Sequence, residues 1–180
     1  MKGKQKPFLR NSEIDELCER LIYEYMGDDG AGKPVDIIGF TTGFLKLTIL
    51  YANIAEEDMS KLGFLADGRT PLLVSCKGQT VSHVFPEKTI VLDRFLKAEK
   101  ERNCRFFTIA HEAFHYLNSL VNHVPQQAAF HNEFDRDCHY TRDELAQLMN
   151  IQECQADRGA AALLIPLITD LQTRCSSVQF

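Results

Sequence analysis

The segment His111-Glu112-Ala113-Phe114-His115 combines two histidines and a glutamate within a stretch of helical character. On a helix, residues i and i+4 lie one turn apart on the same face, so two imidazoles can bind one metal ion at about 2.0–2.1 Å. Glu112 would then lie on the open side of the ion, where a carboxylate can accept a proton from water. The H-E-x-x-H spacing therefore predicts a catalytic metal centre with His111 and His115 as ligands and Glu112 as the general base.

A catalytic zinc ion needs a third protein ligand and one open position. The longer motif H-E-x-x-H-x-x-G-x-x-H is excluded, because Asn118 and Val121 occupy its glycine and third-histidine positions. On a continuing helix, His123 would lie about 12 Å beyond the second histidine. His131 and His139 could reach the ion only if the intervening loop folded back.

Glu153 is the better candidate for the third ligand. It lies on the apolar face of a later predicted helix, where a carboxylate is costly unless it binds a cation. That face is formed by Leu145, Met149, Ala156, Ala160 and Leu164. Asp157 follows one turn later, and we predict that it contacts a metal-binding histidine. The alternative for Glu153 is an ion pair at the helix edge.

Two segments resemble the ImmA/IrrE family of metallopeptidases. Residues 105–116 read R-F-F-T-I-A-H-E-A-F-H-Y, where the family has R-F-T-x-A-H-E-x-G-H-Y. Residues 153–166 read E-C-Q-A-D-R-G-A-A-A-L-L-I-P, where the family has E-x-x-A-N-x-F-A-x-x-L-L-x-P. The resemblance implies zinc ligands at His111, His115 and Glu153, the same set that the spacing favours. The order of elements between Val35 and Pro166 also agrees.

The chain departs from this pattern at three positions. Phe114 replaces a glycine, Asp157 replaces an asparagine and Gly159 replaces a phenylalanine. All proposed metal ligands are retained. Because Phe114 lies on the apolar stripe of its helix, we expect altered packing behind that helix.

The resemblance implies a zinc-dependent metalloendopeptidase that cleaves a helix-turn-helix transcriptional repressor, often in mobile elements or stress responses. One alternative is a zinc-containing binding protein that controls a repressor by contact without proteolysis, although a structural zinc site has no use for Glu112 as a base. A second is a cytosolic hydrolase or zinc protein unrelated to transcription. The residue that stabilises the oxyanion stays open among Tyr116, His83, His131 and His139.

The charge balance argues against direct binding to nucleic acid. The 180 residues carry 20 Lys and Arg against 25 Asp and Glu, a net charge of −5, whereas proteins that bind the phosphate backbone use an excess of positive charge. The basic N-terminus is not followed by an apolar signal segment, and no apolar run has the roughly 18 residues of a membrane span. We therefore expect a cytoplasmic protein that acts on a protein substrate.

Hydrophobic periodicity predicts an α+β fold, and the family resemblance implies that it is zincin-like. Helical spacing predicts helices over Ser12–Met26, Val35–Thr42, Ala98–Val121 and Thr141–Pro166, and a helical turn over Glu56–Leu62. The predicted strands are Leu45–Tyr51, Leu72–Cys76, Val81–Phe85 and Thr89–Leu92. These strands should form a small mixed or antiparallel sheet that packs on the active-site helix.

We expect residues 12–180 to form a single metallopeptidase domain, preceded by a flexible tail over residues 1–11. The segment Asn122–Tyr140 is polar and contains Pro125, so it is predicted to be a loop. The six cysteines contain no C-x-x-C pair, which favours reduced, mostly buried side chains.

Overall fold

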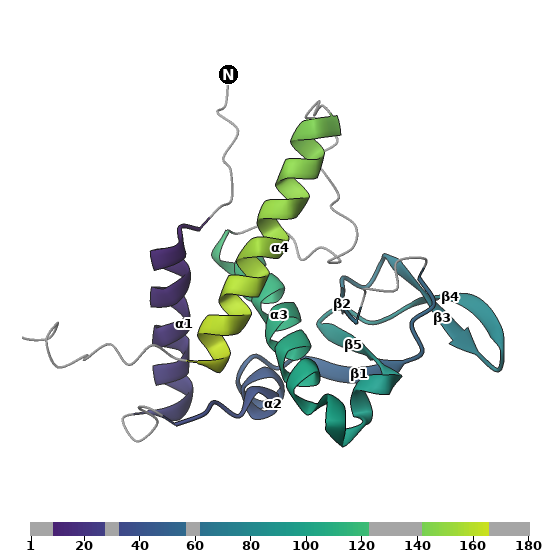
Figure 1. Ribbon diagram of the computed structural model, residues 1–180, viewed down its shortest axis with the longest axis horizontal. Helices are drawn as coiled ribbons and strands as arrows, with labels where there is room; N and C mark the ends of the chain where they lie inside the picture. The colour runs from purple at the N-terminus through teal and green to yellow at the C-terminus, as the bar shows by residue number, and fades with distance from the viewer. Residues whose placement is uncertain (1–8, 28–32, 57–61, 123–141, 166–180) are drawn as a thin grey trace, which may run out of the picture.

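The computed structural model describes residues 9–27, 33–56, 62–122 and 142–165, with side chains throughout except in 142–150. Helices and small sheets form the predicted α+β fold, with α3 between α4 and the main sheet (Figure 1). The helices are α1 (Asn11–Met26), α2 (Ile37–Gly39), α3 (Arg102–Val121) and α4 (Arg142–Leu164). The strands are β1 (Thr48–Ala52), β2 (Gly63–Ala66), β3 (Pro71–Cys76), β4 (Gln79–Val84) and β5 (Thr89–Asp93).

α1 begins at Asn11, one residue before the predicted Ser12, and Arg10 is its N-cap. The Arg10 backbone N–H donates to Glu13 Oε2 at 2.6 Å, and the Arg10 guanidinium donates to Glu13 Oε1 at 2.9 Å. The helix ends at Gly27, whose φ of 67° favours glycine. Its buried face, which includes Ile14, packs against α4.

The helix predicted over Val35–Thr42 is present but shifted by two residues. A single α-helical turn, α2, is followed by a π-helical turn over Phe40–Phe44. The two phenylalanines that bound this turn stack with ring centroids 5.3 Å apart, and both contact Tyr25 of α1. These ring contacts hold the short element against α1.

The main sheet has the order β1-β5-β2 and is mixed, one of the two arrangements predicted, whereas β3 and β4 form a separate two-stranded sheet. β1 runs parallel to β5, and β2 runs antiparallel to it. Sequence analysis missed β2, because three apolar residues after Gly63 are too few for an alternating pattern and the strand depends on pairing with β5. Most of the predicted helical turn Glu56–Leu62 lies outside the described residues.

The predicted strands Leu72–Cys76 and Val81–Phe85 correspond to the hairpin β3–β4. Its two-residue turn is Lys77-Gly78, where both residues have positive φ, as this kind of hairpin turn requires. One face of β3 packs on the main sheet. The contact between them forms a small apolar cluster, separate from the main core between the helices and the sheet. Its buried side chains belong to Phe64, Ala66, Leu72, Val74, Phe85 and Val91.

α3 begins at Arg102, four residues later than the predicted Ala98, because residues 94–97 and 99–101 form 3₁₀ turns. Arg105 stabilises this transition. Its Nη1 donates to the carbonyl oxygens of Leu96 at 2.8 Å and Lys97 at 3.2 Å. The guanidinium thereby provides hydrogen bonds for carbonyl groups at the end of the first 3₁₀ turn. These carbonyl groups precede α3 and accept no hydrogen bond from within that helix.

The helical spacing of Phe107, Ala110, Phe114, Leu117 and Val121 predicts one apolar stripe on α3, and this prediction is correct only in the middle of the helix. Phe114 and Leu117 are buried, but Phe107 and Val121 at the two ends are each 40% exposed. A second face of α3, which includes Ile109, is buried as well. The helix contacts β2 and β5 on one side and α4 on another, so it carries two apolar faces rather than one stripe.

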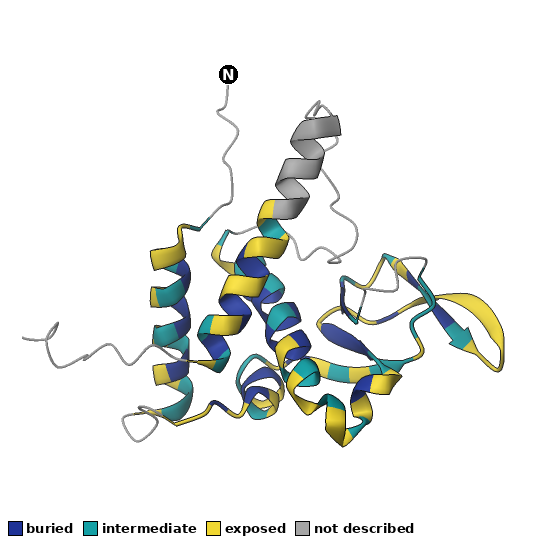
Figure 2. Cartoon of the chain, viewed as in Figure 1, coloured by how far each residue is buried: buried dark blue, intermediate teal, exposed yellow. Residues whose placement is uncertain are grey.

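α4 agrees with the helix predicted over Thr141–Pro166 to within two residues. Ala156, Ala160 and Leu163 are fully buried against α1 and α3, as the dark-blue face in Figure 2 shows. The predicted apolar side chains between residues 145 and 149 lie outside the described side chains, as does almost all of the predicted loop Asn122–Tyr140.

The described cysteines form no disulfide with one another, and two of them, Cys76 and Cys154, are exposed rather than buried as expected. Burial raises the pKa of the Cys18 thiol to about 12, so this side chain behaves as a small apolar residue. Cys138 and Cys175 lie outside the described residues, as do residues 1–8 of the predicted tail. Among the helices described, none is both long enough and apolar enough to cross a membrane.

Candidate metal centre

α3 holds His111 and His115 one turn apart beside α4. Their Nε2 atoms lie 3.0 Å apart, and their rings meet edge to face with centroids separated by 4.8 Å. The side chains are 15% and 12% exposed, respectively. Both imidazoles are therefore largely buried, with a small part of each side chain accessible.

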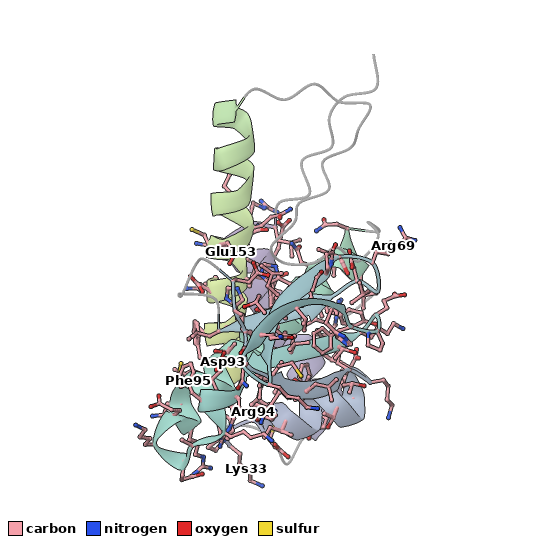
Figure 3. The ribbon with its side chains drawn as sticks, turned by 90° about the vertical axis from the view of Figure 1, so that its right-hand side faces the viewer. Lys33, Arg69, Asp93, Arg94, Phe95 and Glu153 are labelled. Carbon is pink, nitrogen blue, oxygen red and sulfur yellow. The ribbon has the colours of Figure 1, made fainter. Side chains whose placement is uncertain are left out.

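Glu153 of α4 lies next to both histidines. In Figure 3 it is labelled where α4 meets the rest of the molecule. Its Oε2 lies 3.2 Å from His111 Nε2, and its Oε1 lies 3.4 Å from His115 Nε2. Ligands at about 2.0–2.1 Å from a tetrahedral zinc ion are about 3.3 Å from one another. The three side chains thus already have the mutual separations of a metal-ligand set.

Asp157 contacts the other nitrogen of His111. Its Oδ1 lies 3.0 Å from His111 Nδ1. Because a carboxylate only accepts hydrogen bonds, the imidazole donates its Nδ1–H to Asp157, and in the neutral ring Nε2 keeps its lone pair. The predicted role of Asp157 as a partner of a metal-binding histidine is therefore compatible with the contact that it makes.

The charges around the site favour a cation at its centre. Burial alone would lower the pKa of His111, but the hydrogen bond to Glu153 and the nearby carboxylates raise this pKa to about 9. Burial would likewise raise the pKa of Glu153, but the contacts with His111 and His115 lower it to about 2. Both shifts favour a positive charge between the imidazoles and the carboxylates, which a bound metal ion would supply.

Glu112 is buried against β2, on the face of α3 next to the two histidines. It is 4% exposed, and a Cβ on Gly63 would lie only 2.8 Å from its Oε1 and 2.6 Å from Thr108 Cγ2. Burial raises the pKa of Glu112, while the two histidines and a backbone hydrogen bond from Leu65 oppose this shift. Its Oε2 has no hydrogen-bond partner among the described residues.

An unpaired buried carboxylate oxygen is costly to leave in a fold, by roughly 1–3 kcal/mol. Here the cost has a chemical rationale, because the charge of Glu112 interacts with both histidines and its free oxygen can receive a hydrogen bond from water. His111, His115 and Glu153 could together hold a metal ion, since their ligand atoms all lie within 4.8 Å of one another. Three protein ligands leave a fourth position for water or substrate.

Glu153 does not lie on a buried apolar face, as the sequence predicted. Its side chain is 51% exposed and lies at the rim between α4 and the histidines. The like-charged neighbour Asp157 is 61% exposed. Both carboxylates are therefore partly in contact with solvent, and their partners are the imidazoles of His111 and His115.

The remaining candidates for oxyanion stabilisation are only partly located. Tyr116 is 7% exposed and packs in the main core. His83 lies on β4 and makes a ring contact with Phe85. His131 and His139 lie outside the described residues, as does His123. None of the described candidates is placed at the metal ligands.

Sequence reasoning missed Gly63 as a residue of the site. The absence of a side chain there lets β2 approach Glu112 and Thr108 more closely than any other residue would allow. The only signal was a glycine directly before a short apolar run.

No protein-family model matches the chain, and a comparison with curated proteins finds no match. The function is therefore inferred from the geometry of the site and from the resemblance of its motifs.

Proposed function

We propose that the chain is a zinc-dependent metalloendopeptidase of the ImmA/IrrE type. The observation that carries this proposal is the placement of Glu112, a buried carboxylate with an unpaired oxygen, beside the His111, His115 and Glu153 group. A structural metal site needs only ligands. A carboxylate held next to the ligands, without a structural partner for its second oxygen, suits proton transfer in hydrolysis.

Two imidazole nitrogens and one carboxylate oxygen are a donor set that suits zinc. When bound, zinc would supply Lewis-acid polarisation of a carbonyl and lower the pKa of water toward 7. Glu112 would accept a proton from the attacking water and deliver it to the leaving amine of the peptide. Burial, which raises the pKa of Glu112, makes the carboxylate a better base for this transfer.

The proposed substrate is a helix-turn-helix repressor, as the family resemblance suggests. Among the described strands, β2 is the outermost on one side of the main sheet, and it meets Glu112 at Gly63. An extended substrate segment beside β2 would bring its backbone to the base. The net charge of −5 is compatible with a protein that acts on a basic repressor rather than on its operator.

The test is co-expression with candidate helix-turn-helix repressors, with repressor cleavage followed by mass spectrometry. Glu112→Gln preserves the size of the buried side chain and removes the base. We expect cleavage by the wild type and a loss of at least about a hundredfold in the variant, the scale of general-base catalysis.

Glu87→Gln is the matched control, because Glu87 is exposed and distant in sequence from the site. It should cleave like the wild type. If Glu112→Gln and the wild type relieved repression equally without any cleavage product, control of the repressor by contact would replace the peptidase proposal.

A further inference from the structure

The hairpin β3–β4 extends away from the helices, and β4 is exposed along its whole length (Figures 1 and 2). Cys76 and Gln79 flank the two-residue turn, and in such a hairpin this first pair exchanges backbone hydrogen bonds. Beyond it, non-hydrogen-bonded pairs alternate with hydrogen-bonded pairs, so Thr80, Ser82 and Val84 belong to non-hydrogen-bonded pairs. These three residues therefore direct their backbone N–H and C=O groups away from β3. These groups form the free edge of β4.

The opposite edge of the hairpin is already occupied. Leu73 N donates to Glu56 Oε1 at 2.9 Å, and Ser75 N donates to the Asn53 carbonyl at 2.8 Å. The Leu73 carbonyl in turn accepts from Ala55 N at 2.8 Å. Within the described part of the chain, β4 pairs with β3 alone, so one edge of this small sheet is covered and the other is open.

Free edge strands usually carry a charge, a proline or a bulge that prevents another strand from adding to them. β4 reads Gln-Thr-Val-Ser-His-Val and has no Lys, Arg, Asp, Glu or Pro. Its register with β3 runs through six consecutive pairs without a bulge. The edge is therefore open to an incoming strand, and its β-branched residues favour that pairing.

We propose that β4 binds an extended, uncharged segment of the protein substrate as an added strand, at a site separate from the metal centre. This inference rests on the proposed function for the identity of the partner. Strand addition gives affinity through main-chain hydrogen bonds and selectivity through alternate side chains. Exposed Val81 and Val84, one on each face of β4, would favour β-branched or apolar side chains in the segment.

The length of the edge favours a substrate segment over a second copy of the chain. The edge of β4 has six residues and is roughly 20 Å long. A stable interface between two copies of the chain would need many more residues, about 20–30 from each copy, and about 800 Å² of surface on each. A substrate does not need so much area. Two weak contacts along one chain, at β4 and at the metal centre, strengthen each other because the second becomes intramolecular.

The test uses the full-length Glu112→Gln protein, labelled with nitrogen-15, and a synthetic peptide with alternating threonine and valine between terminal lysines. We expect the amide signals of Thr80, Ser82 and Val84 to shift on titration. The same peptide, N-methylated at alternate residues, should cause no shift, because it cannot form the main-chain ladder.

Ser82→Pro removes an N–H that forms no bond within the hairpin, so we expect the fold to be kept and binding to weaken by about tenfold or more. Ser82→Ala keeps the N–H and should bind like the parent. Absence of shifts, or equal binding of the N-methylated peptide, would overturn the proposal even if the proline variant misfolded. Shifts of these amides with protein concentration alone would identify a second copy as the occupant instead. The measurement requires neither metal nor cleavage, so its failure is separate from failure of the peptidase proposal.

Discussion

Phe114 of α3 packs directly on Gly159 of α4, so closely that a Cβ at position 159 would overlap the phenyl ring. The ring is 1% exposed. In the ImmA/IrrE pattern the first of these positions is glycine and the second is phenylalanine. The two residues that depart from this pattern therefore meet at a single contact between α3 and α4.

This contact predicts strong coupling between the two positions. Phe114→Gly should destabilise the protein by about 3–5 kcal/mol through the cavity that it leaves. Gly159→Phe alone should also be destabilising, because two rings cannot share the space. The loss of unfolding free energy in the double variant should be smaller than the sum of the losses in the two single variants, by at least about 1 kcal/mol. Urea denaturation measures all three losses. Additive effects would mean that the contact is not complementary.

Asp157 should strengthen metal binding through His111. Replacement by alanine removes the acceptor of the Nδ1–H and should weaken metal affinity by about 10–100-fold. Asp157→Asn retains a carbonyl oxygen that can accept the same hydrogen bond, so its loss should be smaller. Competition with a chromophoric chelator measures both affinities. Equal losses in the two variants would show that charge, rather than tautomer control, is the contribution of Asp157.

The ionisable groups predict how the stability of the metal-free protein depends on pH. The raised pKa of His111, about 9 against 6.5, gives a contribution that is complete below pH 6.5 and lost as pH rises through 9. The lowered pKa of Glu153, about 2 against 4.5, gives a contribution that is present above pH 4.5 and lost as pH falls toward 2.

The difference in free energy of unfolding between the metal-free wild type and Glu153→Gln should therefore be largest between pH 4.5 and 6.5. Urea denaturation across this range measures it. A difference that did not change with pH would contradict the ion contacts. With metal bound, the alkaline loss should disappear, because the metal replaces the proton.

Gly63→Ala should reduce catalysis without removing the metal. The added Cβ would lie 2.8 Å from Glu112 Oε1, so the carboxylate or β2 must move. A displacement of the base by about 1 Å is enough to lower the rate constant of cleavage by roughly a hundredfold. Gly43→Ala is the matched control, since its Cβ would meet no atom within 4 Å. Full activity of Gly63→Ala would show that the close approach of β2 does not position Glu112.

The local part of the site could be predicted from the sequence, because the spacing of His111 and His115 is a property of one helix. Glu153 was predicted correctly as their neighbour, but by a premise that the structure corrects, since periodicity placed it on a buried face and it is half exposed. The contribution of Gly63 could not be predicted. It depends on the pairing of β2 with β5, a contact between distant segments that no local pattern encodes.

The contact between Phe114 and Gly159 illustrates the same limit. Each departure from the family pattern was visible in the sequence, but nothing local indicated that the two residues meet. Only the packing of α3 on α4 shows that they are in contact.

The central claim is that His111, His115 and Glu153 hold one zinc ion. Elemental analysis of the purified wild type should find about one zinc per chain, and Glu112→Gln and Glu87→Gln should retain it, because neither removes a ligand. His115→Ala and Glu153→Ala should each lose most of the zinc under the same dialysis. A zinc-free wild type, or stoichiometric zinc in the Glu153 variant, would contradict the proposed metal centre.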